Sequence, residues 1–116
     1  MSKNDLIRIC TEIREQYCDK FNYPKEWDLE RCCIGASEFL YEGLLKRGIQ
    51  SYICEGECFG CNHFWVEYED YILDLTIKQF EKFEKIVLPY IFVEKKLKCF
   101  MYKLSDKFQL NDVYLF

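Results

Sequence analysis

Apolar residues near the N-terminus recur at the spacing of one face of an α-helix. Their intervals of three and four residues predict an amphipathic helix from about Asp5 to Phe21. The residues of this face are Leu6, Ile9, Ile13, Tyr17 and Phe21. Ser2 and Asp5 resemble a capping box at its start, and Pro24 marks its end because proline cannot continue a helix.

A second helix is predicted from about Arg31 to Arg47. Its buried stripe is formed by Ala36, Phe39, Leu40 and Leu44. Gly48 follows the last turn, where glycine commonly ends a helix. Two adjacent cysteines, Cys32 and Cys33, therefore lie near the start of this helix.

The remainder of the chain has the pattern of short strands and turns. The predicted strands are Ser51–Cys54, His63–Tyr68, Tyr71–Leu75, Lys85–Val93 and Leu97–Leu104. A loop is predicted over Glu55–Asn62, and a short helix or turn over Thr76–Phe83. Pro89 places its strand at an edge or at a bulge. Helices followed by an antiparallel sheet predict an α+β fold, with the N-terminal helices packed on the sheet.

A turn centred on Glu69 and Asp70 determines which residues of two neighbouring strands lie opposite each other. The predicted pairs are Tyr68 with Tyr71, Trp65 with Asp74, and His63 with Thr76. One face of this hairpin is then wholly apolar and comprises Phe64, Val66, Tyr68, Tyr71, Leu73 and Leu75. Because a one-residue slip would turn this face away from the core, the register is well specified.

The opposite face of the hairpin carries a histidine and an aspartate. His63 and Asp74 are diagonal neighbours, at roughly 7–8 Å between their Cα atoms, a gap that an imidazole and a carboxylate can close. Asp74 lies between Leu73 and Leu75, where a carboxylate without a partner would be costly to bury. A carboxylate beside a histidine sets its tautomer and stabilises the imidazolium.

Cys33 is the natural nucleophile for this pair. The positive end of a helix dipole and a nearby imidazolium both lower the pKa of a thiol. The free backbone N–H groups at a helix start can form an oxyanion hole. The three residues together offer acyl transfer through a thioester. Trp27 and Gln16 are the upstream candidates for an additional side-chain donor to the oxyanion.

Short motifs follow one another from Cys33 to Phe80. Cys33 precedes Ile-Gly-Ala-Ser, Gly48 precedes Ile, His63 precedes Phe-Trp-Val-Glu, and Asp74 precedes Leu-Thr. In this order and spacing they resemble the transglutaminase-like branch of the papain-like cysteine enzymes.

The resemblance implies a single transglutaminase-like domain over residues 1–116, with a papain-like fold and the active site between helix and sheet. It implies Cys33 rather than Cys32 as the nucleophile, His63 as the base and Asp74 as the residue that orients it. It also implies a thiol hydrolase or acyltransferase that acts on an amide of a protein or peptide, either a peptide bond or a glutamine side chain, without a cofactor.

Composition and charge narrow the classes of partner. Hydrophobic residues make up 50% of the chain, which argues against disorder. The net charge is −4 with acids and bases interspersed, so we expect neither nucleic acid nor a membrane as partner. The N-terminus lacks an apolar signal region and the apolar runs are short, so we expect a cytoplasmic protein. In that compartment the eight cysteines are expected to be reduced.

Cysteines close to His63 leave other interpretations open. Cys54, Cys58, Cys61 and His63 supply three thiolates and an imidazole, which is a zinc set and would make a zinc-stabilised binding module. Cys58 and Cys61 also form a C-x2-C pair of the kind found in redox couples. A third alternative is a catalytically inactive papain-like domain used for protein interaction. The surroundings of His63 distinguish these alternatives.

Overall fold

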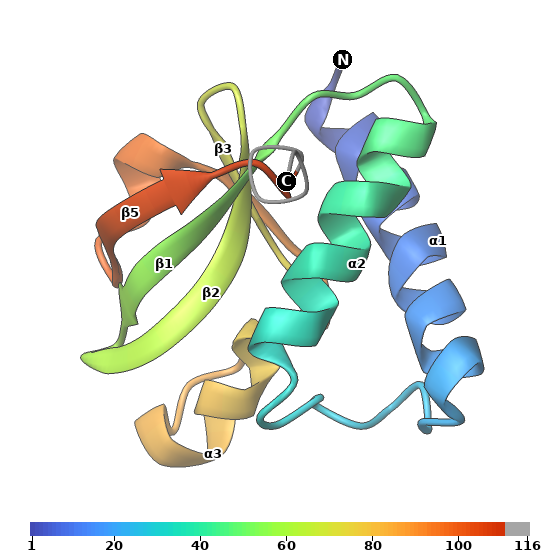
Figure 1. Cartoon of the computed structure of the whole chain (residues 1–116). Coiled ribbons are helices and arrows are strands. Elements are labelled where there is room, and N and C mark those ends of the chain that lie inside the picture. The colour runs from blue at the N-terminus through green and yellow to red at the C-terminus, as the bar shows by residue number, and fades with distance from the viewer. Residues whose placement is uncertain (111–116) are drawn as a thin grey trace.

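Two helices precede a sheet, in the order that the sequence predicts. The computed structural model describes residues 1–110 and is drawn in Figure 1. The long helices are α1 (Lys3–Phe21) and α2 (Cys33–Lys46). The strands are β1 (Tyr52–Cys58), β2 (Cys61–Tyr68), β3 (Tyr71–Asp74), β4 (Phe92–Lys95) and β5 (Tyr102–Phe108). Short helical turns are η1 (Ile77–Phe80), α3 (Glu81–Glu84) and η2 (Lys96–Lys98).

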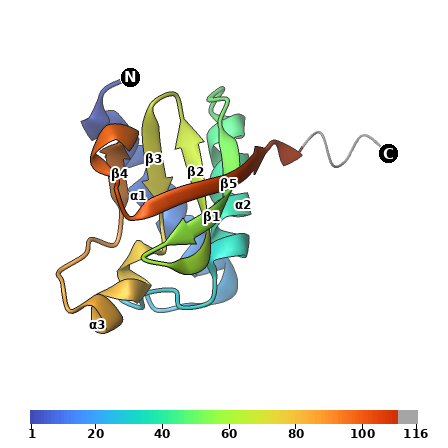
Figure 2. The same ribbon diagram turned by 90° about the vertical axis from the view of Figure 1, so that its left-hand side faces the viewer.

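The strands form one antiparallel sheet in the order β4-β3-β2-β1-β5. Both long helices lie side by side against one face of it (Figure 1). Figure 2, turned by 90° from this view, places the helices behind the sheet, with β5 running across the front. The predicted α+β arrangement of helices on an antiparallel sheet is therefore confirmed.

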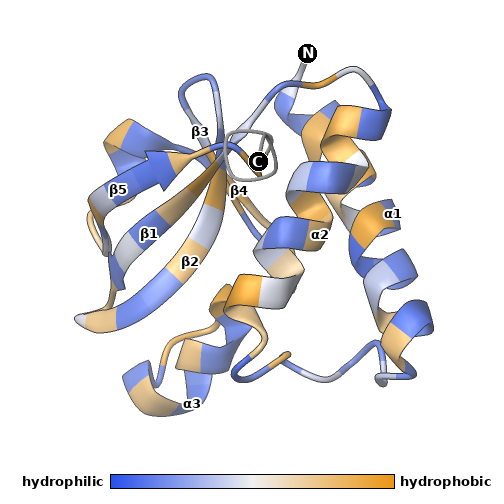
Figure 3. Cartoon of the chain, viewed as in Figure 1, coloured by the Kyte–Doolittle hydropathy of each residue, from blue (hydrophilic) through white to orange (hydrophobic). Residues whose placement is uncertain are grey.

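The first helix begins and ends at the residues that the sequence indicates. Ser2 accepts a hydrogen bond from the backbone of Asp5 and its own N–H donates to the Asp5 carboxylate, which completes the capping box. Asn22 ends the helix with a left-handed φ of 58°. Hydrophilic and hydrophobic residues alternate around α1 in Figure 3, as expected for one buried stripe. Within residues 1–110, no helix combines the length and the apolar character needed to cross a bilayer.

The core lies between the helices and the apolar face of the β2–β3 hairpin. Val66, Leu73 and Leu75 are buried there against residues of both helices. The register is the predicted one, with Tyr68 opposite Tyr71 and Val66 opposite Leu73. Phe64, on the same face, packs in a neighbouring cluster with Tyr41, Ile53 and Leu110.

The segment predicted as the loop Glu55–Asn62 is instead a second hairpin. β1 continues to Cys58, and only Phe59 and Gly60 form the turn before β2. Both turn residues have positive φ, 52° and 77°, as a two-residue hairpin turn requires. β1 also carries a bulge between Glu55 and Gly56 where it pairs with β5. The loop prediction was wrong because glycines inside a bulged strand look like turn residues.

Two strand predictions in the C-terminal half also need correction. Of the predicted strand Lys85–Val93, only the last residues enter β4, and Pro89 lies outside every strand. The predicted strand Leu97–Leu104 is divided between η2 and β5, which continues to Phe108. Residues 111–116, the end of the predicted single domain, lie outside the described part of the chain.

Candidate active site

Cys33 is the first residue of α2. Cys32 precedes it as the N-cap and makes no side-chain capping hydrogen bond. The backbone N–H of Cys32 donates to the carbonyl oxygen of Leu29 and that of Ala36 to the carbonyl oxygen of Cys32. The N–H groups of the intervening first turn have no acceptor within the helix. Cys33 therefore lies beside backbone donors and at the positive end of a helix dipole.

The sulfur of Cys33 faces β2. The His63 ring and the backbone N–H of Phe64 lie close enough to this sulfur to lower the pKa of its thiol. Within the described residues, the pairing of β2 with β3 ends at Val66 and Leu73. Beyond this point the two strands part, and the start of α2 meets the free edge of β2.

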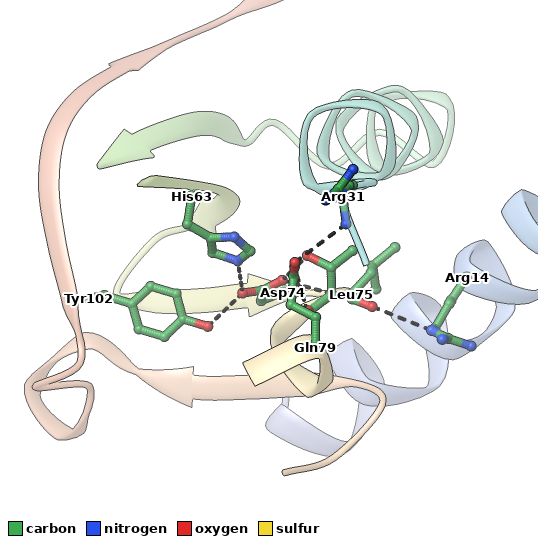
Figure 4. A network of polar contacts seen from close by, with 8 residues as sticks. Arg14, Arg31, His63, Asp74, Leu75, Gln79 and Tyr102 are labelled. Atoms are coloured by element: carbon green, nitrogen blue, oxygen red, sulfur yellow. Dashed lines mark hydrogen bonds and ion pairs between the residues drawn. The ribbon is translucent and has the colours of Figure 1, made fainter. Parts of the chain in front are cut away.

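His63 contacts Asp74 as the diagonal placement predicts. The Nε2 atom of His63 lies 2.7 Å from Oδ2 of Asp74 (Figure 4). Since this nitrogen is taken, Nδ1 is the ring atom left for Cys33. The other carboxylate oxygen, Oδ1, accepts from the backbone N–H and the hydroxyl of Thr76, at 2.8 and 3.2 Å. These bonds fix the carboxylate, and the carboxylate fixes the ring.

Aromatic rings enclose this pair. The Phe80 ring meets the His63 ring edge-on at 5.0 Å between centroids, and the Trp65 ring lies 6.2 Å away. The side chains of His63 and Asp74 are each only 1% exposed. Cys33 itself is partly exposed, so it lies between the buried pair of His63 and Asp74 and the solvent.

Burial and hydrogen bonding act in opposite directions on the three ionisable groups. Burial favours neutral His63, but the Asp74 carboxylate and bonds to Asp74 and Cys33 raise its pKa to about 9. Burial also favours neutral Cys33, yet the bond to His63, its positive charge and the Phe64 N–H bring the thiol pKa below its usual value. Burial likewise opposes the ionised form of Asp74, but the His63 charge and four hydrogen bonds hold its pKa below the usual range. Near neutral pH these directions favour a thiolate, an imidazolium and a carboxylate in a row.

The two adjacent cysteines have different surroundings. Cys32 turns toward α1, where it packs against the core and hydrogen-bonds with the Tyr17 hydroxyl. Cys33 alone of the two reaches His63. The structure thus brings together Cys33, His63 and Asp74, whose catalytic roles stay a prediction.

Sequence reasoning missed Tyr102. Its hydroxyl donates a 2.7 Å hydrogen bond to Oδ2 of Asp74, the same oxygen that His63 contacts. Nothing in the local sequence signals this contact, because it depends on β5 lying next to β1 in the sheet.

Arg14 was also missed as a support of the site. It is 4% exposed and donates to the carbonyl oxygens of Lys25, Trp27 and Leu75, at 2.7, 2.5 and 3.4 Å. These bonds join α1 to the loop before Cys33 and to the residue after Asp74. Figure 4 shows the contact with Leu75. An arginine within the apolar stripe of the first helix was the available signal.

Neither candidate for a side-chain oxyanion donor is placed at the sulfur. Gln16 lines a groove with Glu42, Lys46 and Arg47, in the half of α2 that lies away from Cys33. Trp27 packs at the edge of the core and its ring meets Tyr23 at 5.0 Å. The backbone N–H groups at the start of α2 remain as the donors beside Cys33.

The zinc set has no geometric support. Its members have separate partners: Cys54 bonds with Glu67, Cys58 with Tyr102 and His63 with Asp74, while Cys61 is exposed. Within residues 1–110, no three or more His, Cys, Asp or Glu side chains form a metal-binding arrangement. All eight cysteines are free thiols, including the C-x2-C pair of Cys58 and Cys61.

Comparison of the chain with protein-family models, with curated proteins and with solved structures finds no match in any of the three. An interpretation of the site therefore depends on its own geometry and on the motifs between Cys33 and Phe80. The geometry consists of a buried imidazole hydrogen-bonded to a buried carboxylate, with a thiol beside the imidazole.

Proposed function

We propose that this chain is a thiol hydrolase or acyltransferase that acts on an amide through Cys33, His63 and Asp74. One observation carries the proposal: the only histidine of the chain is buried, is hydrogen-bonded to a buried carboxylate and lies close enough to a helix-start thiol to lower the pKa of that thiol. A histidine that served packing alone would not need two ionisable partners. The order Cys, His, Asp, with each element in its place, also agrees with the transglutaminase-like resemblance of the motifs.

The first half of the reaction forms a thioester. The Cys33 thiolate attacks the amide carbonyl carbon, and the carbonyl electron pair moves onto oxygen. The backbone N–H groups at the start of α2 stabilise this oxyanion. The imidazolium of His63 then donates its proton to the leaving nitrogen as the C–N bond breaks, which releases an amine, or ammonia from a glutamine side chain.

The second half regenerates the thiol site. Neutral His63 removes a proton from water or from an acceptor amine, which attacks the thioester carbonyl. The C–S bond breaks, Cys33 leaves as a thiolate, and His63 is again an imidazolium. Water gives a carboxylic acid and an amine gives a new amide. Asp74 keeps the ring in one orientation and stabilises its positive charge in both halves.

Access to the sulfur is consistent with a protein or peptide substrate. Cys33 is partly exposed, and the next residue, Ile34, is 52% exposed. A polypeptide can therefore approach the start of α2 from solvent, while the contact between His63 and Asp74 stays buried. No step of the reaction requires a cofactor.

Selective alkylation tests the proposal. We would treat the full chain with iodoacetamide at mildly acidic pH and locate the label by mass spectrometry of peptides. Ordinary thiols are protonated under these conditions, so a thiolate paired with His63 should react first. Preferential labelling of Cys33 is expected, and this preference should be lost in His63→Ala.

Two other cysteines serve as matched controls. Cys61 is exposed and lies two residues before His63 on β2, and Cys32 is the chain neighbour of Cys33. Cys61→Ala and Cys32→Ala should both leave the labelling of Cys33 unchanged. Equal and slow labelling of all thiols would contradict the proposal and would favour the catalytically inactive interaction domain instead.

A second measurement addresses the reaction itself. A library of glutamine-containing peptides with an amine acceptor present should yield ammonia, a shortened peptide or a new amide. Each of these products should disappear in Cys33→Ser. Absence of all three products from the wild-type protein, together with an unreactive Cys33, would exclude the proposed activity.

A further inference from the structure

Two donors share one oxygen of Asp74. The His63 ring and the Tyr102 hydroxyl each lie 2.7 Å from Oδ2, while Thr76 holds Oδ1. Figure 4 shows the two dashed contacts converging on this carboxylate from opposite sides. The two bonds from Thr76 already keep the carboxylate from rotating. The Tyr102 bond is therefore not needed to orient the carboxylate and has a different effect.

The position of the Tyr102 hydroxyl is fixed by its own surroundings. Tyr102 is the first residue of β5 and pairs with Cys58 of β1. Its ring meets the Trp65 ring edge-on at 4.9 Å between centroids and the Phe92 ring at 5.7 Å. A rigid ring therefore presents the hydroxyl to Asp74.

Hydrogen bonds that stabilise a carboxylate make it a weaker base. A hydroxyl that donates to Oδ2 therefore reduces how strongly the same oxygen attracts the N–H of His63. The reaction proposed above needs His63 to bind a proton and then to donate it. Such a transfer is fastest when the proton affinity of the imidazole is neither very high nor very low. A carboxylate with His63 as the sole donor on Oδ2 would hold that proton too firmly.

We propose that Tyr102 is a positioning residue that acts through Asp74 and limits how tightly His63 holds its proton. This inference rests on the proposed function for its purpose, but the contact that it concerns is independent of any substrate. Tyr102 touches neither Cys33 nor the space beside the sulfur, so it is not a catalytic residue.

Ionisable groups from three parts of the chain surround this network. The groups that face His63, Asp74 or the Tyr102 hydroxyl are Cys33 of α2, Cys58 of β1 and Cys99 before β5. Burial raises the pKa of Cys58 and of Cys99, so both are neutral thiols when His63 titrates. Cys33 is the one group besides Asp74 whose charge changes the proton affinity of His63, and the experiment therefore includes a variant without it.

Direct titration of His63 tests the proposal. His63 is the only histidine, so its ring C–H resonances in an NMR spectrum are unambiguous. In Tyr102→Phe the titration midpoint should rise by about 0.5 to 1 pH unit, the effect of one hydrogen bond. In an activity assay, kcat should fall with little change in KM, because His63 becomes a weaker acid and substrate contacts are unchanged.

Tyr90→Phe is the matched control. The Tyr90 hydroxyl donates a bond of the same length, 2.7 Å, to the carbonyl oxygen of Glu26, away from Asp74. This variant should leave the His63 midpoint unchanged. Replacement of Tyr102 by 3-fluorotyrosine keeps the ring and makes the hydroxyl a stronger donor, so the midpoint should fall below that of the wild type.

The outcomes separate this inference from the proposed function. The titrations are repeated in a Cys33→Ser background, where no thiol chemistry is available. The shift of the His63 midpoint caused by Tyr102→Phe should persist there. A midpoint that stays unchanged or falls in Tyr102→Phe would overturn the role of Tyr102, whatever the activity of the chain. A midpoint that rises as expected in an inactive chain would support the role of Tyr102 and count against the enzyme.

Discussion

Nη2 of Arg14 donates a 2.5 Å hydrogen bond to the carbonyl oxygen of Trp27 and so fastens α1 to the loop that leads into Cys33. The same guanidinium reaches Lys25 on that loop and Leu75 beside Asp74. One side chain of the first helix thus ties together the two segments that carry the thiol and the carboxylate.

Arg14→Met should therefore destabilise the protein and loosen the site. Three carbonyl groups lose a charged donor, so we expect the free energy of unfolding to fall by about 3 kcal/mol, measured by urea denaturation. Arg8→Met is the control, because Arg8 is exposed and its ion pair with Glu12 spans 3.5 Å; its effect should stay within about 0.5 kcal/mol. Equal effects of the two substitutions would show that the Arg14 bonds contribute nothing special.

The pH dependence of stability should reveal the charge pair of Cys33 and His63. The folded pKa of His63 is raised to about 9, so its contribution is complete below its unfolded pKa of about 6.5 and is lost as the pH rises through about 9. The folded pKa of Cys33 is lowered, so its contribution is complete above its unfolded pKa of about 8.5 and is lost as the pH falls through the folded value. Between about pH 6.5 and 8.5 the two slopes have opposite signs and offset each other.

Removal of the thiol should reveal how His63 alone makes the free energy of unfolding depend on pH. In Cys33→Ala, the free energy of unfolding should fall as the pH rises from about 6.5, because the folded chain still binds a proton that the unfolded chain has released. Wild-type protein measured in parallel by urea denaturation should show a shallower fall over this interval, because the lowered pKa of Cys33 contributes a slope of opposite sign. The same slope in both proteins would mean that Cys33 and His63 do not share a proton.

The rate of Cys33 alkylation should rise in two steps with pH. The first step reflects formation of the thiolate–imidazolium pair and should lie below the range of ordinary thiols, since the pKa of Cys33 is lowered. The second should lie near pH 9, where His63 loses its proton and leaves an unpaired thiolate. In His63→Gln a single step at the pH of an ordinary thiol is expected, measured with iodoacetamide by peptide mass spectrometry.

Gly56→Ala should damage the site from a distance. A Cβ at this position would overlap the carbonyl oxygen of Lys103 and lie 2.9 Å from Cη2 of Trp65. Relief of this overlap must separate β1 from β5 next to Tyr102, so we expect a loss of about 2 kcal/mol in the free energy of unfolding. The His63 midpoint should move in the direction seen for Tyr102→Phe. Glu57→Ala, at the exposed neighbouring position, is the control and should change neither quantity.

Local rules were sufficient for the hairpin that carries the acid–base pair. The alternation from Phe64 to Leu75 leaves only one register that buries the apolar face, and this register is observed up to the pair of Val66 with Leu73. The predicted pairs of Trp65 with Asp74 and of His63 with Thr76 are not formed because the strands part there, yet His63 and Asp74 still meet at 2.7 Å. The capping box at Ser2 and the position of Cys33 at a helix start follow equally from short-range patterns. These parts of the site depend on residues close together in the chain.

Local sequence patterns do not predict the order of the strands in the sheet. Tyr102 meets Asp74 only because β5 returns to pair with β1, and no pattern within β5 specifies its partner. The strand β5 is also hard to recognise in the sequence, because most of its residues are exposed and polar. The bulge at Gly56 depends on the same pairing, so the sequence predicts a loop there instead of a strand.

The separation of Cys33, His63 and Asp74 along the chain gives thiol reactivity a use as a folding signal. The groups that lower the pKa of the Cys33 thiol, the His63 ring and the Phe64 N–H, reach the sulfur only once α2 has docked on the β2–β3 hairpin, because both belong to β2. An unfolded or partly folded chain therefore carries only ordinary, slowly reacting cysteines. A brief pulse of alkylating reagent at acidic pH, applied at intervals during refolding, would count the molecules that have completed this docking.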